Sequence, residues 1–148
     1  MKLLLMRHGE ASFSAGRSDK DRPLTMHGKD QAIRAGKWLK SKGLCPDVIL
    51  CSSAIRTRQT WEMLFKPAHI KAEAHIMDDL YLANPNDLLE AMQRFVKQTQ
   101  CLLVIAHNPG VSTLASALSG QRMGMGTGHI VVVDQKDTQA RLIDHFTA

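Results

Sequence analysis

Short, almost unbroken runs of apolar residues alternate along this chain with longer stretches in which apolar residues recur every three or four positions. An unbroken run is typical of a strand buried on both faces, whereas the three-to-four spacing is typical of a helix that buries one side. The runs predict strands at residues 2–6, 48–51, 75–80, 102–106, 130–134 and 140–144, of which 75–80 is the weakest.

The periodic stretches predict four helices between these strands. Thr25 and the pair Asn84 and Pro85 are suited to cap two helix starts, and Ser52 or Ser53 a third. The stripes expected to face the core are Ala32, Ala35, Gly36 and Leu39 in residues 26–42; Ala54, Thr57, Trp61, Leu64 and Phe65; Leu88, Leu89, Met92, Phe95 and Val96; and Val111, Leu114, Ala115 and Leu118 after Asn108 and Pro109.

Strand and helix thus alternate four times before a final pair of strands joined by a polar turn around residues 136–137. This order predicts an α/β fold, a three-layer α/β/α sandwich with a mostly parallel central sheet. No repeat or linker divides the chain, so residues 1–148 are expected to form a single domain. Ligands of such sheets bind where the carboxyl ends of strands meet the following helices.

Composition narrows the class of protein. The chain is 44% apolar and 22% charged, near the averages for soluble proteins. Its longest purely apolar runs, residues 3–6 and 130–133, are far shorter than the ~20 residues that cross a bilayer. Charged residues after Met6 interrupt what would otherwise resemble a signal peptide, so we expect a cytoplasmic protein with no membrane partner.

The formal net charge of +5 favours an acidic partner such as a phosphate ester, a phosphoprotein or a nucleic acid. Nucleic acid is the weakest of these, because the basic residues are dispersed and only one Tyr, two Trp and four Phe could stack on bases. Cys45, Cys51 and Cys101 form no C-x-x-C pair, so they are interpreted as small, buried apolar residues.

Four side chains stand at the positions where this fold would place a ligand. Arg7 and His8 follow the first strand, Arg56 lies in the first turn after the second, and His107 follows the fourth. Two arginine forks and two imidazoles, with amides of helix N-termini, suit a dianionic phosphoryl group. The polar segment 9–24 is expected to lie over this site.

The same residues lie within four blocks that resemble the histidine phosphatase superfamily, which contains phosphoglycerate mutases and acid phosphatases. The resemblance covers nearly the whole chain. The blocks are Arg7-His8-Gly9-Glu10; Arg22-Pro23-Leu24-Thr25 with Gly28, Gln31 and Ala32; Ser52, Ser53, Arg56, Gln59 and Thr60; and His107-Asn108-Pro109.

The resemblance implies a phosphoglycerate mutase-like fold in which His8 is the nucleophile and becomes phosphorylated. Arg7, Arg56 and His107 would bind the phosphoryl oxygens, and no metal or cofactor is required. A neutral imidazole is a good nucleophile when a hydrogen bond, here expected to a nearby backbone carbonyl, orients its other nitrogen. Arg58 would face away from Arg56 and stay at the surface.

The remaining polar candidates are given structural or surface roles. Glu10 could tune the site or be solvated, and neither alternative is favoured. Five further histidines have no placement after a strand that would suggest catalysis: His27, His69, His75, His129 and His145.

The chain departs from the larger relatives where they carry an L-x-E string, whose glutamate protonates an oxygen leaving group. Leu80, Tyr81 and Leu82 stand there, so Leu82 takes the glutamate position, and Asp78, Asp79 or Tyr81 could supply an acid by another route. No insertion that would form a lid is evident, and an open pocket is therefore expected.

Both departures resemble the SixA-like branch, whose substrates are phosphohistidines on phosphorelay proteins. The sequence therefore predicts a phosphohistidine phosphatase acting on a phosphorylated protein, with a phosphorelay domain as the candidate partner. Two alternatives stay open: a phosphatase of small phosphate monoesters, and a phosphoprotein-binding module without turnover.

Overall fold

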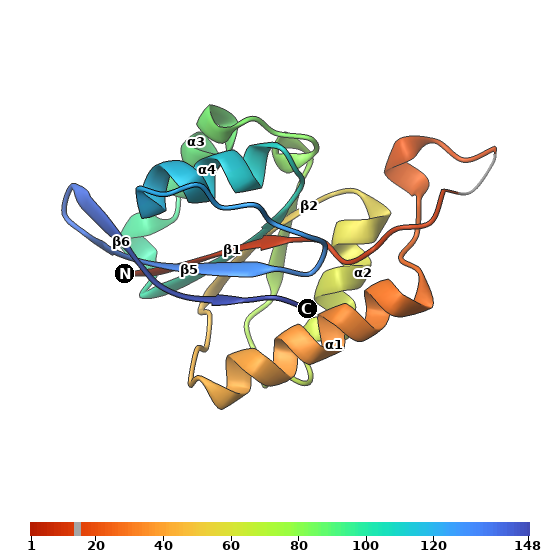
Figure 1. Ribbon diagram of the computed structural model, residues 1–148, viewed down its shortest axis with the longest axis horizontal. Helices are drawn as coiled ribbons and strands as arrows, with labels where there is room; N and C mark the ends of the chain where they lie inside the picture. Colours follow the sequence, from red (N-terminus) through yellow and green to blue (C-terminus); the bar gives the residue numbers. More distant parts are fainter. Residues whose placement is uncertain (14–15) are drawn as a thin grey trace.

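The middle layer of the molecule is a sheet of six strands in the order β3-β2-β4-β1-β5-β6 (Figure 1). This computed structural model describes residues 1–13 and 16–148; residues 14 and 15, within the predicted loop 9–24, lie outside the described part. The strands are β1 (Lys2–Arg7), β2 (Val48–Ser52), β3 (Ala74–Met77), β4 (Cys101–Ala106), β5 (Ile130–Lys136) and β6 (Gln139–Phe146). The first four pair in parallel, and β5 pairs antiparallel with β1 and β6.

Two helices cover each face of this sheet (Figure 1). The helices are α1 (Met26–Ser41), α2 (Ile55–Leu64), α3 (Pro85–Gln93) and α4 (Gly110–Ser119). Leu3 and Leu5 of β1 belong to the core under α3 and α4, whereas Leu4 and Met6 belong to the core over α1 and α2. The central strands are apolar without interruption because both faces are buried. The predicted three-layer α/β fold with a mostly parallel sheet is confirmed.

The loop after β1 is held against the start of α1 by a close approach of two backbones. A Cβ added at Gly9 would lie 2.5 Å from the Gly28 carbonyl oxygen, and one added at Gly28 would lie 2.1 Å from the Glu10 carbonyl oxygen. Only glycine fits at both positions. Thr25 caps α1 as predicted, since its Oγ1 accepts a hydrogen bond from the Gly28 amide at 2.9 Å.

Two predicted elements are shorter than the apolar pattern suggested. The strand expected over 75–80 ends at Met77, and a 3₁₀ turn over Asp78–Leu80 follows. Aspartates are poor strand residues and favour turns, and this turn still buries Leu80 completely. The stripe expected to continue to Val96 leaves the α-helix after Gln93, and a separate 3₁₀ turn covers 96–98.

One predicted helix start is also corrected. Ser52 and Ser53 were expected to cap α2, but the residue before this helix is Ala54, whose side chain cannot cap. Helix α4 begins at Gly110, directly after Asn108 and Pro109 as predicted, and Pro109 is its N-cap residue. In the described part of the chain, no helix is long and apolar enough to span a bilayer.

Candidate active site

The candidate site lies at the carboxyl ends of three adjacent strands, β2, β4 and β1. His8 follows β1, His107 follows β4, and Ser52 is the last residue of β2. Because β4 lies between the other two strands, the three chain ends converge, and the rings of His8 and His107 lie 5.3 Å apart between centroids. The structure therefore brings together the two histidines that the sequence placed after different strands.

The imidazole of His8 is oriented by its own backbone neighbour. Its Nδ1 lies 2.7 Å from the Gly9 carbonyl oxygen, the kind of partner expected from the sequence. A carbonyl only accepts, so Nδ1 carries the proton and Nε2 carries a lone pair. That lone pair accepts a hydrogen bond from Arg56 Nε at 3.3 Å. His8 thus presents Nε2 as its reactive atom.

Burial lowers the pKa of His8 to about 4, with further lowering by the charges of Arg56, Arg7 and Arg22, although the Gly9 hydrogen bond acts in the opposite direction. At neutral pH the ring is therefore uncharged. An uncharged imidazole is the nucleophilic form, so the site favours the state that phosphoryl transfer needs.

His107 is held from β2 by Ser52. The Oγ of Ser52 lies 2.7 Å from Nε2 of His107, while Nδ1 is buried and has no hydrogen-bond partner among the described residues. Burial first, and then the proximity of His8 and Arg56, lowers the pKa of His107 to about 3. The sequence missed this role of Ser52, which belongs to the same block as Arg56.

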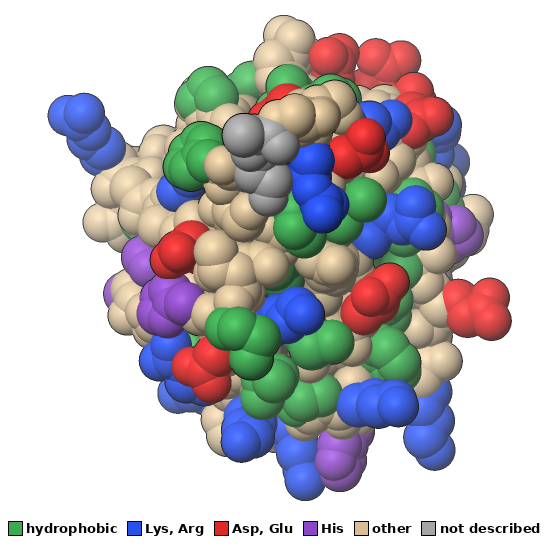
Figure 2. All heavy atoms as spheres, turned by 90° about the vertical axis from the view of Figure 1, so that its right-hand side faces the viewer, with side chains coloured by type: hydrophobic (Ala, Val, Ile, Leu, Met, Phe, Trp, Pro, Cys, Tyr) green, Lys and Arg blue, Asp and Glu red, His purple; other side chains and the backbone are tan. Residues whose placement is uncertain are grey.

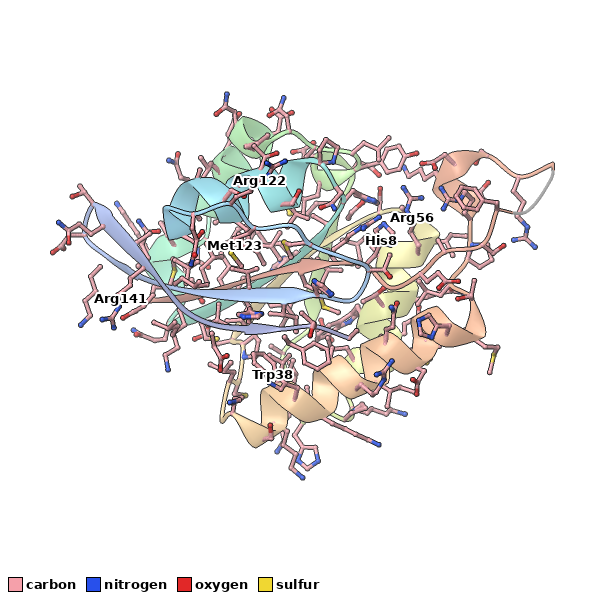
Figure 3. The ribbon with its side chains drawn as sticks, in the orientation of Figure 1. His8, Trp38, Arg56, Arg122, Met123 and Arg141 are labelled. Atoms are coloured by element: carbon pink, nitrogen blue, oxygen red, sulfur yellow. The ribbon has the colours of Figure 1, made fainter. Side chains whose placement is uncertain are left out.

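The two arginines come from different elements, Arg7 from the end of β1 and Arg56 from the first turn of α2. Arg7 donates from Nη1 to the Met125 carbonyl oxygen at 3.1 Å, and its buried Nε has no partner in the described chain. Arg56, only 3% exposed, lies beside His8 at the start of α2 (Figure 3). Arg58 is exposed, as the helical-face argument predicted. The unpartnered Arg7 Nε and His107 Nδ1, together with Arg56, are suited to hold three phosphoryl oxygens.

The segment of residues 16–22, here called the cover, adds a side chain that the sequence reasoning missed. The Asp19 carbonyl oxygen accepts from Arg56 Nη1 at 2.8 Å, and its carboxylate accepts from Arg56 Nη2 at 3.1 Å and from the Tyr81 hydroxyl. Arg22 Nη1 also donates to this carboxylate, at 2.9 Å. Asp19 stands three residues before the Arg22 block, in the loop expected to lie over the site, and this placement was the available signal.

The site is consequently covered, which corrects the expectation of an open pocket. His8 is 7% exposed and His107 is 2% exposed, although the chain has no long insertion. The short turn Asp19–Asp21 is enough to cover Arg56 because its backbone and side chain both bind the guanidinium.

The three candidate acids, Asp78, Asp79 and Tyr81, lie in different surroundings. Asp78 pairs with Lys20 and Asp79 with Arg94, both at 3.1 Å and both largely exposed. Tyr81 alone approaches the site, with its ring edge-on to His107 at 5.6 Å between centroids. Burial, followed by the hydrogen bond to Asp19, raises the pKa of Tyr81. The pKa of Asp19 is lowered to about 2, mainly by the hydrogen bond from Tyr81 and then by those from Arg56 and Arg22.

Polar residues of the recognised blocks tie the loops around the site together. Thr60 Oγ1 accepts from the Gly9 amide at 3.0 Å, Gln59 Oε1 accepts from the Leu24 amide at 2.8 Å, and Gln31 Oε1 accepts from the Glu10 amide at 2.8 Å. These side chains position the ends of the β1–α1 connection without touching a reacting atom.

The other candidates lie at the surface or serve the scaffold. The Glu10 carboxylate lies 3.8 Å from His27 Nε2, an exposed pair. His129, half-buried, accepts from the Gly126 amide at 3.0 Å and so shapes the glycine-rich loop whose Met125 carbonyl holds Arg7. His69, His75 and His145 are exposed. Cys51 and Cys101 are buried as expected, whereas Cys45 is exposed, which corrects the expectation for that residue.

Figure 2 views the end of the molecule that carries the cover. Lys and Arg side chains are scattered over this face among acidic and apolar ones, and no continuous basic band crosses it. Within the described residues, no group of three or more His, Cys, Asp or Glu side chains is placed to hold a metal ion.

A sheet edge that presents a neutral imidazole beside two arginine forks is suited to bind a phosphoryl group and to attack it. The model of the histidine phosphatase superfamily (branch 1) matches residues 3–81, just over half of the chain. The chain belongs to this superfamily of phosphatases.

Curated relatives of this chain include an uncharacterized protein and a phosphohistidine phosphatase homolog. An uncharacterized protein of Mycobacterium tuberculosis is 38% identical over 116 residues, which cover 77% of this chain and 70% of the relative. A phosphohistidine phosphatase SixA homolog of Haemophilus influenzae is 30% identical over 135 residues, 82% of this chain and 79% of the relative.

Solved structures agree in fold. A protein histidine phosphatase SixA complexed with tungstate superimposes with a TM-score of 0.90 at 25% identity, covering 99% of this chain and 97% of that one. The alpha-ribazole phosphatase of Shigella flexneri, at 19% identity and a TM-score of 0.73 over 97% and 95% of the two chains, shares the fold alone.

Proposed function

We propose that this protein is a metal-independent phosphohistidine phosphatase that removes the phosphoryl group from a phosphorylated histidine of another protein. The partner we propose is a phosphorelay domain in the cytoplasm that carries a phosphorylated histidine. Removal of its phosphoryl group would then serve signal transduction. This substrate class is supported by the likeness of the chain to a SixA homolog over 82% of its length and to a SixA structure over 99%.

The observation that carries the proposal is the hydrogen bonding of the two acidic groups beside Arg56, which are Asp19 and Tyr81. Asp19, with a pKa of about 2, is ionised at neutral pH and cannot donate a proton. The proton of Tyr81 is engaged with Asp19, and its pKa is raised. Among the described residues, no carboxylic acid is therefore poised to protonate an alkoxide. A phosphoramidate does not need one, because its leaving imidazole departs neutral once its distal nitrogen carries a proton.

The reaction would proceed in two transfers. His8 Nε2 attacks phosphorus, the phosphorus–nitrogen bond to the substrate breaks, and the substrate histidine leaves with the bonding electron pair as a neutral ring. Arg7 Nε, Arg56 and His107 Nδ1 bind the equatorial oxygens, where charge stabilisation is needed. Water then attacks phosphorus, and the bond between phosphorus and Nε2 of His8 breaks with its electron pair returning to Nε2. Both protons of the water leave with the released phosphate, because Nδ1 of His8 has kept its own proton throughout.

The covered site favours a second candidate, a phosphatase of small phosphate monoesters. A cover that closes over Arg56 would suit a small substrate that can be enclosed. This function requires Tyr81 to act as the acid despite its engagement with Asp19.

The test is a comparison of kcat/KM for a phosphohistidine protein, an aryl phosphate and an alkyl phosphate at one pH, with a chelator present. General acid catalysis is typically worth 10²- to 10⁴-fold, so the phosphohistidine protein should exceed the alkyl phosphate by about that factor. The aryl phosphate should fall between them, since its leaving group needs little protonation. Equal values for the phosphohistidine protein and the alkyl phosphate would replace this proposal with the small-ester phosphatase.

A further inference from the structure

The Asp19 carboxylate occupies the arginine that the phosphoryl group has to use. One N–H of each Arg56 Nη atom is bound to Asp19, through the carbonyl oxygen at 2.8 Å and the carboxylate at 3.1 Å. The Nε of the same guanidinium lies 3.3 Å from the nucleophilic Nε2 of His8. One planar cation therefore bridges the nucleophile and an internal anion.

The cover that carries Asp19 is attached by polar contacts. None of its residues, 16–22, is buried. Beyond Arg56, its contacts include those of Arg22 with Asp19 and the Ser12 carbonyl oxygen, of Lys20 with Asp78, and of Tyr81 with Asp19. Exposed ionic contacts are individually weak, so a strong anion can displace them.

The Asp19 carboxylate would still be hydrogen-bonded after it separates from Arg56. Arg22 stands in the same cover and donates to the Asp19 carboxylate at 2.9 Å, and this carboxylate is 45% exposed. Withdrawal therefore does not leave a buried unpaired charge, the outcome that would make such a movement costly. Arg56, 4% exposed in its side chain, would in contrast be left uncompensated unless another anion took the place of Asp19.

We propose that Asp19 is a built-in competing anion, which an incoming phosphoryl group displaces from Arg56 and which rebinds Arg56 as phosphate departs. This inference rests on the proposed function in one respect, which is that a phosphoryl group binds at His8. It does not depend on which molecule donates that group. With competition of this kind, the apparent affinity for phosphate equals the intrinsic affinity multiplied by the fraction of molecules in which Arg56 is free. It would speed release of the inorganic product.

The test is calorimetric titration of inorganic phosphate into the wild-type protein, Asp19→Asn and Asp21→Asn. Asp21 is the matched control, because it lies in the same turn and its carboxylate accepts from Ser18. Asp19→Asn removes the negative charge that competes for Arg56, so it should bind phosphate at least about tenfold more tightly, a change of about 1.4 kcal/mol. Asp21→Asn should bind it as the wild type does.

The opposite result is equally informative. If Asp19→Asn binds phosphate as weakly as the wild type or more weakly, Asp19 positions Arg56 or is irrelevant, and the competing-anion proposal is wrong. Phosphate binding is measured without any substrate, so failure of the phosphohistidine assignment leaves this result unchanged. If none of the three proteins binds phosphate, the anion site itself is wrong, and both proposals fall.

A second variant covers the case in which Asp19→Asn does not fold, as judged by circular dichroism. Tyr81→Phe removes one hydrogen bond that holds the Asp19 carboxylate. A single hydrogen bond contributes about 0.5–1.5 kcal/mol, which corresponds to phosphate binding tighter by about two- to tenfold. Weaker phosphate binding by Tyr81→Phe would mean that the Tyr81 hydroxyl is itself a phosphate ligand and would overturn the proposal.

Discussion

The base of the site and its cover are built by different physical means. His8 and His107 follow two central strands whose residues are almost all buried, and each ring has one nitrogen anchored, to the Gly9 carbonyl and the Ser52 hydroxyl. The cover, residues 16–22, buries none of its residues and is attached by hydrogen bonds and ion pairs.

This difference separates two tasks of a phosphatase. Apolar packing is insensitive to ligands, so the base keeps its geometry through the reaction. Ionic contacts compete with an incoming anion, so the cover can respond to the substrate. The following predictions test the base and then the cover.

The largest effect concerns the proton affinity of His8. With a pKa lowered to about 4, below the ordinary 6.5, the folded protein binds this proton far less tightly than the unfolded chain does. The unfolded state therefore takes up the extra proton, and stability falls as pH drops from 6.5 towards 4, by at most about 1.4 kcal/mol per pH unit for one group. An NMR titration of the His8 Cε1–H resonance, assigned with His8→Ala, should show a midpoint near 4. A midpoint near 6.5 would mean that the base does not keep the ring neutral.

Arg56 should carry the next largest effect. Arg56→Ala removes a donor to the transferring oxygens, and loss of one such donor costs about 10²- to 10³-fold in kcat. Arg58→Ala is the control, because Arg58 is exposed on the same helix. Steady-state rates on an aryl phosphate should drop at least about 100-fold only for the Arg56 variant. Comparable losses in both variants would contradict the assignment.

These two arginines also show what could be predicted from the sequence. Helical geometry allowed only one of Arg56 and Arg58 to reach the pocket, and the first-turn position and the family pattern both chose Arg56. The apolar runs of β1, β2 and β4 located the strand ends at which His8, Arg56 and His107 meet. Apart from the family pattern, these inferences rest on local periodicity, which the chain encodes directly.

The missed features depend on contacts between segments distant in the sequence. Asp19 meets Tyr81 across 62 positions, and Ser52 meets His107 across 55. A serine after a strand is also a good helix cap, so local rules assigned Ser52 that role. The loop 9–24 was expected to lie over the site, but its closure through Asp19 was missed. Polar contacts leave no apolar periodicity, and a loop rich in Ser, Gly and Asp looks the same whether it is closed or open.

Ser52 should have an intermediate effect. Ser52→Ala leaves Nε2 of His107 without its partner, so the ring loses its orientation toward the phosphoryl site. Supporting residues of this kind typically contribute about 10- to 100-fold in metal sites, and the lower end, about tenfold in kcat, is expected here. Ser119→Ala, on the far end of α4, is the control. An unchanged kcat, with an unchanged pH profile, would show that Ser52 does not position His107.

The smallest effects are expected at the exposed carboxylates near the cover. Asp78 and Asp79 are paired with Lys20 and Arg94 in exposed ion pairs, which are worth about 0–1 kcal/mol. Asp78→Asn and Asp79→Asn should therefore change kcat/KM for an alkyl phosphate by less than about fivefold. A loss of 100-fold in either variant would identify that residue as the acid and would favour the small-ester phosphatase.

The central claim is that Nε2 of His8 receives the phosphoryl group. A single-turnover experiment tests it most directly: a protein carrying radiolabelled phosphohistidine is mixed with excess enzyme, quenched in alkali within milliseconds, and digested. The account predicts a transient label, stable in alkali and labile in acid, on the peptide that contains His8, and no label with His8→Ala. Release of phosphate without any labelled enzyme, or a label on a different residue, would contradict it.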